Sequence, residues 1–208
     1  MLYITYKMSV TLIISSPHGL CPPNKIDRVC DLSATISAII FCKAIMKYGN
    51  IRYDFLPGDE YRYVHDLNRI SSRNTSYRKR LEEKFKQSSK SSIIIDVHSF
   101  PNTYLDEAGE INFFKKGEIA PDVVLLGGPK DSFGGNSLCL TLFDALSKDK
   151  VNCKIINGIS VNDILNQGYE YGVSGVLIEF NEKYSKQIDR LYEICDIIAK
   201  ALSKIGNI

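Results

Sequence analysis

Four runs of apolar residues, rich in valine and isoleucine, are continuous along the chain and do not alternate with polar residues. They cover residues 9–15, 91–97, 121–127 and 174–180. Runs of this kind are typical of strands that are covered on both faces, as in an α/β sheet. Residues 50–55 and 151–156 form two weaker strand candidates.

Segments with the helical spacing of apolar residues lie between these strands. The clearest covers residues 31–50, where Asp31 favours a helix start and Gly49 can close the end. Its apolar face is predicted to consist of Leu32, Ile36, Ile39, Ile40 and Met46. Further helix candidates are residues 75–87, 137–148 and 184–202. The alternation of strands and helices predicts a three-layer α/β fold.

The length of the chain sets the number of domains. Its 208 residues, of which 44% are hydrophobic and 24% charged, suffice for one sizeable core and are few for two. We therefore expect residues 1–208 to form a single domain. The polar segments 16–30, 56–74 and 166–173 are predicted to be long irregular connections, which is where binding sites usually lie.

Charge and hydropathy argue against several classes of function. A net charge of +2 and a pI near 8.1 are too mild for a nucleic-acid-binding protein, which usually carries clustered basic residues. The apolar run near the N-terminus is too short to span a bilayer, which takes about 20 residues. The six cysteines include no C-x-x-C pair, and nothing in their spacing requires an oxidising compartment. We therefore expect a cytoplasmic protein without a membrane or nucleic-acid partner.

The three histidines of the chain stand at or near predicted strand ends or in polar loops. His18 follows the first strand, His98 follows the apolar part of the second, and His65 opens the stretch HDLNR. A lone histidine is more often structural than a ligand. Two at the ends of strands in one α/β sheet point to a site, because ligands bind outside the carboxyl ends of such strands. Two imidazoles with one carboxylate and a water form a recurring catalytic zinc set.

Three aspartates compete for the position of the carboxylate ligand. Asp31 begins the helix after the His18 strand, so its side chain can point back toward the strand end, although a plain helix cap is the simpler interpretation. Asp27 lies about one turn earlier. Asp96 points to the same side of an extended chain as His98, either as a ligand or as a residue that supports the histidine. The residues alone leave this choice open.

A metal site that cleaves amides also needs a general base and a group that binds the substrate. Glu179 is the charged residue of the last core strand, where burying a carboxylate is costly unless it is paired or used. Arg69, beside Asn68, can clamp a substrate carboxylate bidentately. The competing interpretation of Arg69 is a surface ion pair with Asp66. His65 is expected to support the site from the same stretch.

Five motifs, in order over about residues 15–184, resemble the N-formylglutamate amidohydrolase family. They are SSPHG, HDLNR, IDVHSFP, PDVVLLGGPKDSFGGNS and GVLIEFNEKY. The resemblance implies a fold like that of zinc carboxypeptidases and aspartoacylases, with a mixed, mostly parallel sheet between helices. It also implies the roles of six residues. His18, Asp31 and His98 would bind zinc, Asn68 and Arg69 the substrate carboxylate, and Glu179 would be the general base.

Two departures from the family pattern concern the substrate. The segment 157–173 lacks the proline-tyrosine-glycine-glycine loop and the further histidine of the family, and Lys183 is the nearest cation where the family has an arginine. We therefore expect a zinc-dependent hydrolase of small N-acyl amino acids, such as N-formyl amino acids, or of peptide-like amides with a free carboxylate. The alternatives are a peptidase or poly-γ-glutamate hydrolase on the same scaffold, and a non-catalytic relative that binds metal or ligand. Mixed imidazole and carboxylate sites also accept manganese or cobalt in place of zinc. The sequence leaves the oligomeric state open.

Overall fold

The structure is a computed structural model that describes residues 10–21, 30–31, 33–88, 92–106, 112–127, 135–156 and 162–205. Its strands are β1 (Val10–Ser16), β2 (Ile51–Pro57), β3 (Ser92–Phe100), β4 (Val123–Gly127), β5 (Cys153–Ile156) and β6 (Ser174–Asn181). Its helices are α1 (Ala34–Ile45), α2 (Ser76–Lys86), α3 (Gly135–Lys148), α4 (Asp163–Glu170) and α5 (Ile188–Ile205), with short 3-10 turns η1 (Ile70–Ser72) and η2 (Glu182–Lys186). All six predicted strand segments are confirmed.

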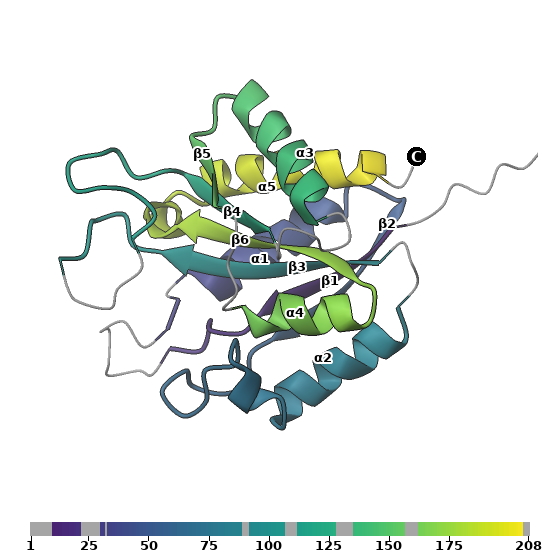
Figure 1. The fold of residues 1–208 in the computed structure, drawn as a ribbon. Coiled ribbons are helices and arrows are strands. Elements are labelled where there is room, and N and C mark those ends of the chain that lie inside the picture. Colours follow the sequence, from purple (N-terminus) through teal and green to yellow (C-terminus); the bar gives the residue numbers. More distant parts are fainter. Residues whose placement is uncertain are drawn as a thin grey trace, which may run out of the picture.

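The described strands form one mixed sheet in the order β2-β1-β3-β6-β4-β5. Neighbouring strands are parallel except for β4 and β6, which pair antiparallel. The strands β1, β3 and β6 therefore end at the same edge of the sheet, on the left in Figure 1. This arrangement confirms the predicted α/β class with a mixed, mostly parallel sheet.

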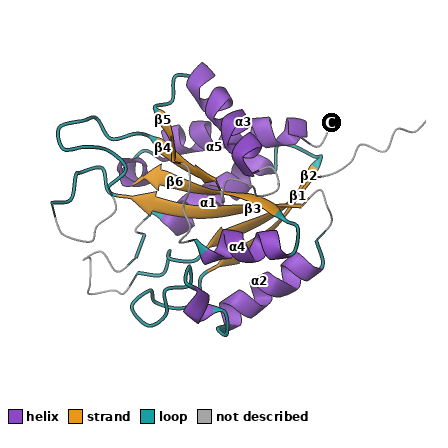
Figure 2. Ribbon diagram, viewed as in Figure 1, coloured by secondary structure: helices purple, strands orange, loops and turns teal. Residues whose placement is uncertain are grey.

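Helices cover both faces of the sheet and give the predicted three layers (Figure 2). Helices α1, α3 and α5 pack on one face, where alternate residues of β3 such as Ile93, Ile95 and Val97 join their core. Helices α2 and α4 pack on the other face, where Ile94 joins theirs. The central strands are therefore covered on both sides, which explains why their sequences are continuously apolar.

The buried face of α1 differs from the prediction. Ile36, Ile39 and Met46 were expected in the core but are 39%, 53% and 72% exposed. Ile40 is buried as predicted, together with Ala34, Ser37, Ala38, Phe41, Cys42, Ala44 and Ile45, and Leu32 is outside the described residues. Small side chains let the helix approach the sheet and α5 closely, and the larger isoleucines on the opposite face are left outside. The helix is also shorter than predicted, so Asp31 lies before it.

Helix α4 overlaps the segment 166–173, which was predicted to be an irregular connection. Asn162 caps its first turn by accepting a hydrogen bond from the backbone N–H of Leu165. Gly168 has a low helix propensity, and its side of the helix lies against Ile94 and Phe85 at ordinary van der Waals distance. Tertiary packing thus overrides a weak local propensity.

The relative lengths of the strands place the functional side chains. Strand β1 ends at Ser16, two residues before His18, whereas β3 continues to Phe100 and is buried throughout. His98 therefore lies inside β3. The sequence had suggested a position after the end of this strand. The strand register sets Ser15 of β1 beside Asp96, and Glu179 of β6 beside His98.

A disulfide links Cys21 and Cys30 and was not predicted from the sequence. It joins the segment after His18 to the residue before Asp31. The cysteines Cys42, Cys139, Cys153 and Cys195 are free. Across the residues described, no helix combines the length and the apolar character needed to cross a membrane.

Candidate metal centre

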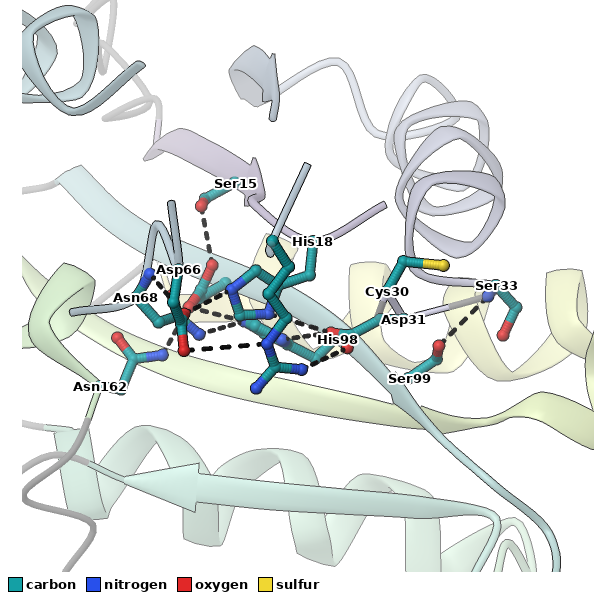
Figure 3. Close-up of polar contacts among 12 residues, drawn as sticks. Ser15, His18, Cys30, Asp31, Ser33, Asp66, Asn68, His98, Ser99 and Asn162 are labelled. Atoms are coloured by element: carbon teal, nitrogen blue, oxygen red, sulfur yellow. Dashed lines mark hydrogen bonds and ion pairs between the residues drawn. The ribbon is translucent and has the colours of Figure 1, made fainter. Parts of the chain in front are cut away.

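Three of the predicted ligands meet at the edge of the sheet (Figure 3). The Oδ2 atom of Asp31 lies 2.5 Å from Nδ1 of His98 and 3.6 Å from Nδ1 of His18. The two imidazole rings are 5.0 Å apart and meet edge to face. All three side chains are buried. The Nδ1 atoms of both histidines thus converge on one carboxylate.

The backbone around His18 holds it against Asp31. The backbone N–H of Asp31 donates to the carbonyl oxygen of His18 over 3.0 Å, which fixes the segment after β1 beside the segment before α1. Gly19 permits this approach, since a Cβ atom there would lie 1.7 Å from Oγ1 of Thr35. On the far side of the ring, Nε2 of His18 lies 2.8 Å from Oδ1 of Asp66.

A buried carboxylate orients His98 in the same way. The Oδ2 atom of Asp96 lies 3.1 Å from Nε2 of His98, and Asp96 also accepts hydrogen bonds from Ser15 (2.7 Å) and from Asn162 (2.6 Å). Since Ser15 donates to Asp96, the 2.6 Å contact between the hydroxyls of Ser15 and Tyr77 is donated by Tyr77. Both histidines therefore have Nε2 in contact with a carboxylate and Nδ1 directed toward Asp31. In metal sites, a carboxylate bound to one ring nitrogen fixes the tautomer that leaves the other nitrogen for the metal.

The charges of the cluster are strongly coupled. Burial alone raises the pKa of Asp31, but the positive charge of His98 and the hydrogen bond between His98 and Asp31 outweigh it and hold the pKa well below its usual value. Burial alone lowers the pKa of His98, but the carboxylates of Asp96 and Asp31 raise it well above its usual value. Without a cation in the cluster, a proton therefore lies between Nδ1 of His98 and Asp31. A metal ion has to displace this proton.

Glu179 faces the same cluster from β6. It stands directly beside His98 in the strand register. Burial raises its pKa to about 8; the charge of His98 opposes the shift, and the charges of Asp31 and Asp96 add to it. A carboxyl group with a pKa near neutrality can both accept and release a proton at physiological pH.

The residues of the cluster fit a divalent metal ion. Ligand atoms of His18, Asp31 and His98 all lie within 4.8 Å of one another. The Nδ1 atom of His18 is buried and has no hydrogen-bond partner, which is costly unless a ligand uses its lone pair. Two imidazoles and one carboxylate are a donor set suited to zinc and to related first-row ions.

Asn68 and Arg69 lie next to the cluster in different ways. The side-chain amide nitrogen of Asn68 is 3.1 Å from Nε2 of His98, and its Oδ1 atom is buried without a hydrogen-bond partner. Arg69 is half exposed and donates from Nε to Asp66 over 3.1 Å, which is the ion pair that the sequence offered as its alternative role. Of the two, Asn68 is the one in direct contact with a candidate ligand.

Other residues singled out in the sequence lie outside the cluster. His65 is half exposed and pairs with Glu60. The neighbouring residue Asp66, and not His65, contacts His18. Lys183 pairs with Asp122 over 2.6 Å. Asp27 is outside the described residues. Asp96 contacts Nε2 of His98, and its role as a ligand or as a supporting residue stays a prediction.

The sequence did not single out Arg62 and Asn162, and it treated Asp66 only as an ion-pair partner. The Nη1 atom of Arg62 lies 3.3 Å from Oδ1 of Asp31, and its Nε atom 3.8 Å from Asp66. The one signal for Arg62 and Asp66 was their place in the polar segment that also holds Asn68. Asn162 had no signal, because its contact with Asp96 depends on where α4 begins.

Comparisons with known proteins were made by sequence and by structure. No protein-family model matches the chain, and no curated protein matches it in sequence. Among solved structures, it is similar to the gene product Atu2144 from Agrobacterium tumefaciens, with a TM-score of 0.63 and 13% identity over 96% of this chain and 91% of that chain. It is similar to an N-formylglutamate amidohydrolase from Ralstonia eutropha, with a TM-score of 0.61 and 13% identity over 95% of this chain and 94% of that one.

An N-acetylmuramoyl-L-alanine amidase from Clostridium difficile is also similar, with a TM-score of 0.54 and 15% identity over 95% of this chain and 94% of that chain. At these identities the likeness establishes the fold. The chain therefore has the α/β fold of solved amidohydrolases, including an N-formylglutamate amidohydrolase, and this confirms at the level of fold the resemblance that the motifs predicted.

Proposed function

We propose that the protein is a metal-dependent amidohydrolase. Its substrate would be a small N-acyl amino acid, such as an N-formyl amino acid, or a peptide-like amide with a free carboxylate. The observation that carries the proposal is the buried cluster of His18, Asp31 and His98 with Glu179 beside it. A metal site and a carboxyl group of raised pKa in one place are the two parts that amide hydrolysis needs.

In this proposal His18, Asp31 and His98 hold one zinc ion, and manganese or cobalt are the alternatives. When bound, the ion would supply Lewis acidity for polarising the amide carbonyl and for activating the attacking water. Asp66 and Asp96 keep the Nε2 side of each ring occupied, so that Nδ1 is the atom left for the metal. This division of roles follows from the contacts on the two sides of each ring.

Glu179 acts as the general base of the reaction. Its raised pKa allows it to take a proton from the attacking water and to pass that proton to the leaving amine. A carboxylate in a buried strand is otherwise destabilising, which is why a role in chemistry explains its presence better than packing does.

Asn68, Arg69 and Arg62 are the groups that would hold the substrate. The unpartnered Oδ1 of Asn68 is available to a donor such as an amide N–H. Arg69 would bind the free carboxylate after exchanging its ion pair with Asp66. Arg62 is the cation in contact with Asp31, and its side chain is 36% exposed, so it can reach both the cluster and a ligand.

The catalytic assignment is tested by replacing Glu179 with glutamine and assaying amide cleavage with the metal content verified. We expect turnover to fall about 100-fold to 10,000-fold, as for removal of a general base. Glu193→Gln, which changes an exposed carboxylate on α5, is the matched control and should leave turnover unchanged. Unchanged turnover in Glu179→Gln with metal still bound would remove Glu179 from this role.

A panel of substrates in the same assay distinguishes the proposed substrate class from its alternatives. Formyl-amino and acyl-amino acids represent the leading proposal, and α-linked and γ-linked glutamyl peptides represent a peptidase or poly-γ-glutamate hydrolase. A wild-type protein that binds metal and cleaves no member of the panel would favour the non-catalytic alternative.

The predicted cytoplasmic location stays a prediction. The disulfide between Cys21 and Cys30 argues against it, because disulfides are rare in the cytosol of most organisms.

A further inference from the structure

The start of α4 touches the residues that support the candidate metal centre. Asn162 and Asp163 open this helix, in the segment where the sequence departs from the family pattern. The proposed function gives this segment no role. Figure 3 shows Asn162 at the end of the cluster away from Ser99, and its side chain contacts Asp96.

The side chain of Asn162 is 4% exposed and makes a hydrogen bond at each end. Its Nδ2 atom donates to Oδ2 of Asp96 over 2.6 Å, and its Oδ1 atom accepts from the backbone N–H of Leu165 over 2.9 Å. The opposite orientation of the amide would set an oxygen against a carboxylate and an NH2 group against an N–H. The chemistry therefore fixes Nδ2 as the atom that faces Asp96.

The same oxygen of Asp96 contacts His98. Its Oδ2 atom is 3.1 Å from Nε2 of His98, while Oδ1 is bonded by Ser15. The rotamer of Asp96 thus depends on Ser15 on one oxygen and on Asn162 on the other. A rotation of this carboxylate would release Nε2 of His98 and with it the direction of Nδ1 toward Asp31.

Asp163 holds the start of α4 in place. Its backbone N–H donates to the carbonyl oxygen of Asn68 over 2.9 Å. Its carboxylate accepts from the fully buried Arg78 over 2.8 Å and from Arg73 over 2.7 Å. These contacts tie the helix start to the loop that holds Asn68, so Asn162 cannot follow Asp96 if the carboxylate turns.

We propose that Asn162 is a positioning residue for the metal centre, which fixes the Asp96 carboxylate and through it the imidazole of His98. The inference rests on the proposed function, because it assumes that the cluster holds a metal ion. Residues that orient a metal-binding histidine typically contribute a factor of about 10 to 100 in metal affinity. The competing interpretation is that Asn162 is only the N-cap of α4.

Asn162→Ser separates the two interpretations. Serine keeps the oxygen that caps the helix, but its shorter side chain carries no amide donor that reaches Asp96. We expect the zinc dissociation constant of the metal-stripped protein, measured by competition with a chromophoric chelator, to rise about 10-fold to 100-fold. Asn162→Asp keeps the size and the cap and sets a second carboxylate against Asp96, so its loss of affinity should be at least as large.

Thr75→Ala is the matched control. Thr75 caps α2 as Asn162 caps α4, but the contacts of its side chain are within residues 72–78. It should leave the zinc dissociation constant within about twofold of that of the wild type, a change far below the effect expected for a positioning residue. If Asn162→Ser does not fold, Asn162→Asp carries the test.

Zinc affinity within twofold of wild type in a folded Asn162 variant would overturn this inference and leave the proposed function intact. A wild-type protein that binds no zinc or related ion would overturn both. Equal losses in Asn162→Ser and Thr75→Ala would also overturn the inference, since they would show that a general loss of stability, and not the contact with Asp96, lowers the affinity.

Discussion

Glu179 is a carboxyl group whose acidity differs strongly from that of an ordinary glutamate. It lies beside His98 in the sheet, and burial raises its pKa to about 8. The carboxylates of Asp31 and Asp96 add to this shift, while the charge of His98 opposes it. The neutral acid is therefore the form that the metal-free fold accommodates best.

This pKa predicts a pH dependence of stability in the metal-free protein. The folded-state pKa of Glu179 is raised above its ordinary value, so its contribution to stability is complete below about pH 4.5 and is lost as the pH rises through about 8. Glutamine has no proton to lose. We expect Glu179→Gln to gain stability relative to wild type between pH 5 and pH 8.5, measured as the free energy of unfolding in urea with a chelator present.

The other ionisable groups of the cluster are unchanged in this comparison, so their pH dependence largely cancels between the two proteins. A stability difference that is the same at pH 5 and pH 8.5 would show that Glu179 titrates normally in the folded state. In that case burial has not shifted its pKa, and the case for its role as a general base loses its electrostatic support.

At the residue scale the sequence predicted His18, Asp31 and His98, and the structure brings them together. Each lies within a strand, shortly after one or shortly before a helix, where the direction of a side chain follows from local structure. Arg62 and Asn162 could not be found in this way, because their contacts depend on loop conformation and on packing between segments far apart in the sequence.

At the scale of elements, the strands were predictable and the helix faces were less so. Continuous runs of valine and isoleucine are long and unambiguous, whereas α1 is apolar on nearly all sides and its buried face is decided by the close approach of alanines. Helix α4 was missed because its Gly168 weakens the local signal, while packing against Ile94 and Phe85 stabilises it.

The fully buried Arg78 of α2 joins three elements at one point. Its guanidinium donates to the carbonyl oxygen of Leu67, to Asp163 and to Gln167. It thereby holds the loop before η1 and the start of α4 against α2. We expect Arg78→Met to lower the free energy of unfolding by about 3–5 kcal/mol, because it leaves buried acceptors without their cation.

Arg80→Met is the control for this prediction. Arg80 lies on the same helix, is half exposed and pairs with Asp59, so its loss should cost at most about 1 kcal/mol. Urea unfolding of the two variants makes the comparison. Similar small losses in both would mean that Arg78 does not hold these elements together.

At the scale of the whole molecule, the sheet topology creates the candidate site. The parallel strands β1, β3 and β6 end at one edge and bring together His18, His98 and Glu179, and α2 and α4 enclose that edge from one face. The fold is that of solved amidohydrolases although the identities are only 13% and 15%.

The central claim is that His18, Asp31 and His98 hold a metal ion, and its most direct test is the metal content of the purified protein. We predict about one zinc or related divalent ion per chain in the wild type, as expected for a single site with three protein ligands, and loss of that ion in His98→Ala. His65→Ala, which removes the exposed histidine outside the cluster, should retain it. Full metal occupancy in His98→Ala, or no metal in wild type after reconstitution, would contradict the account.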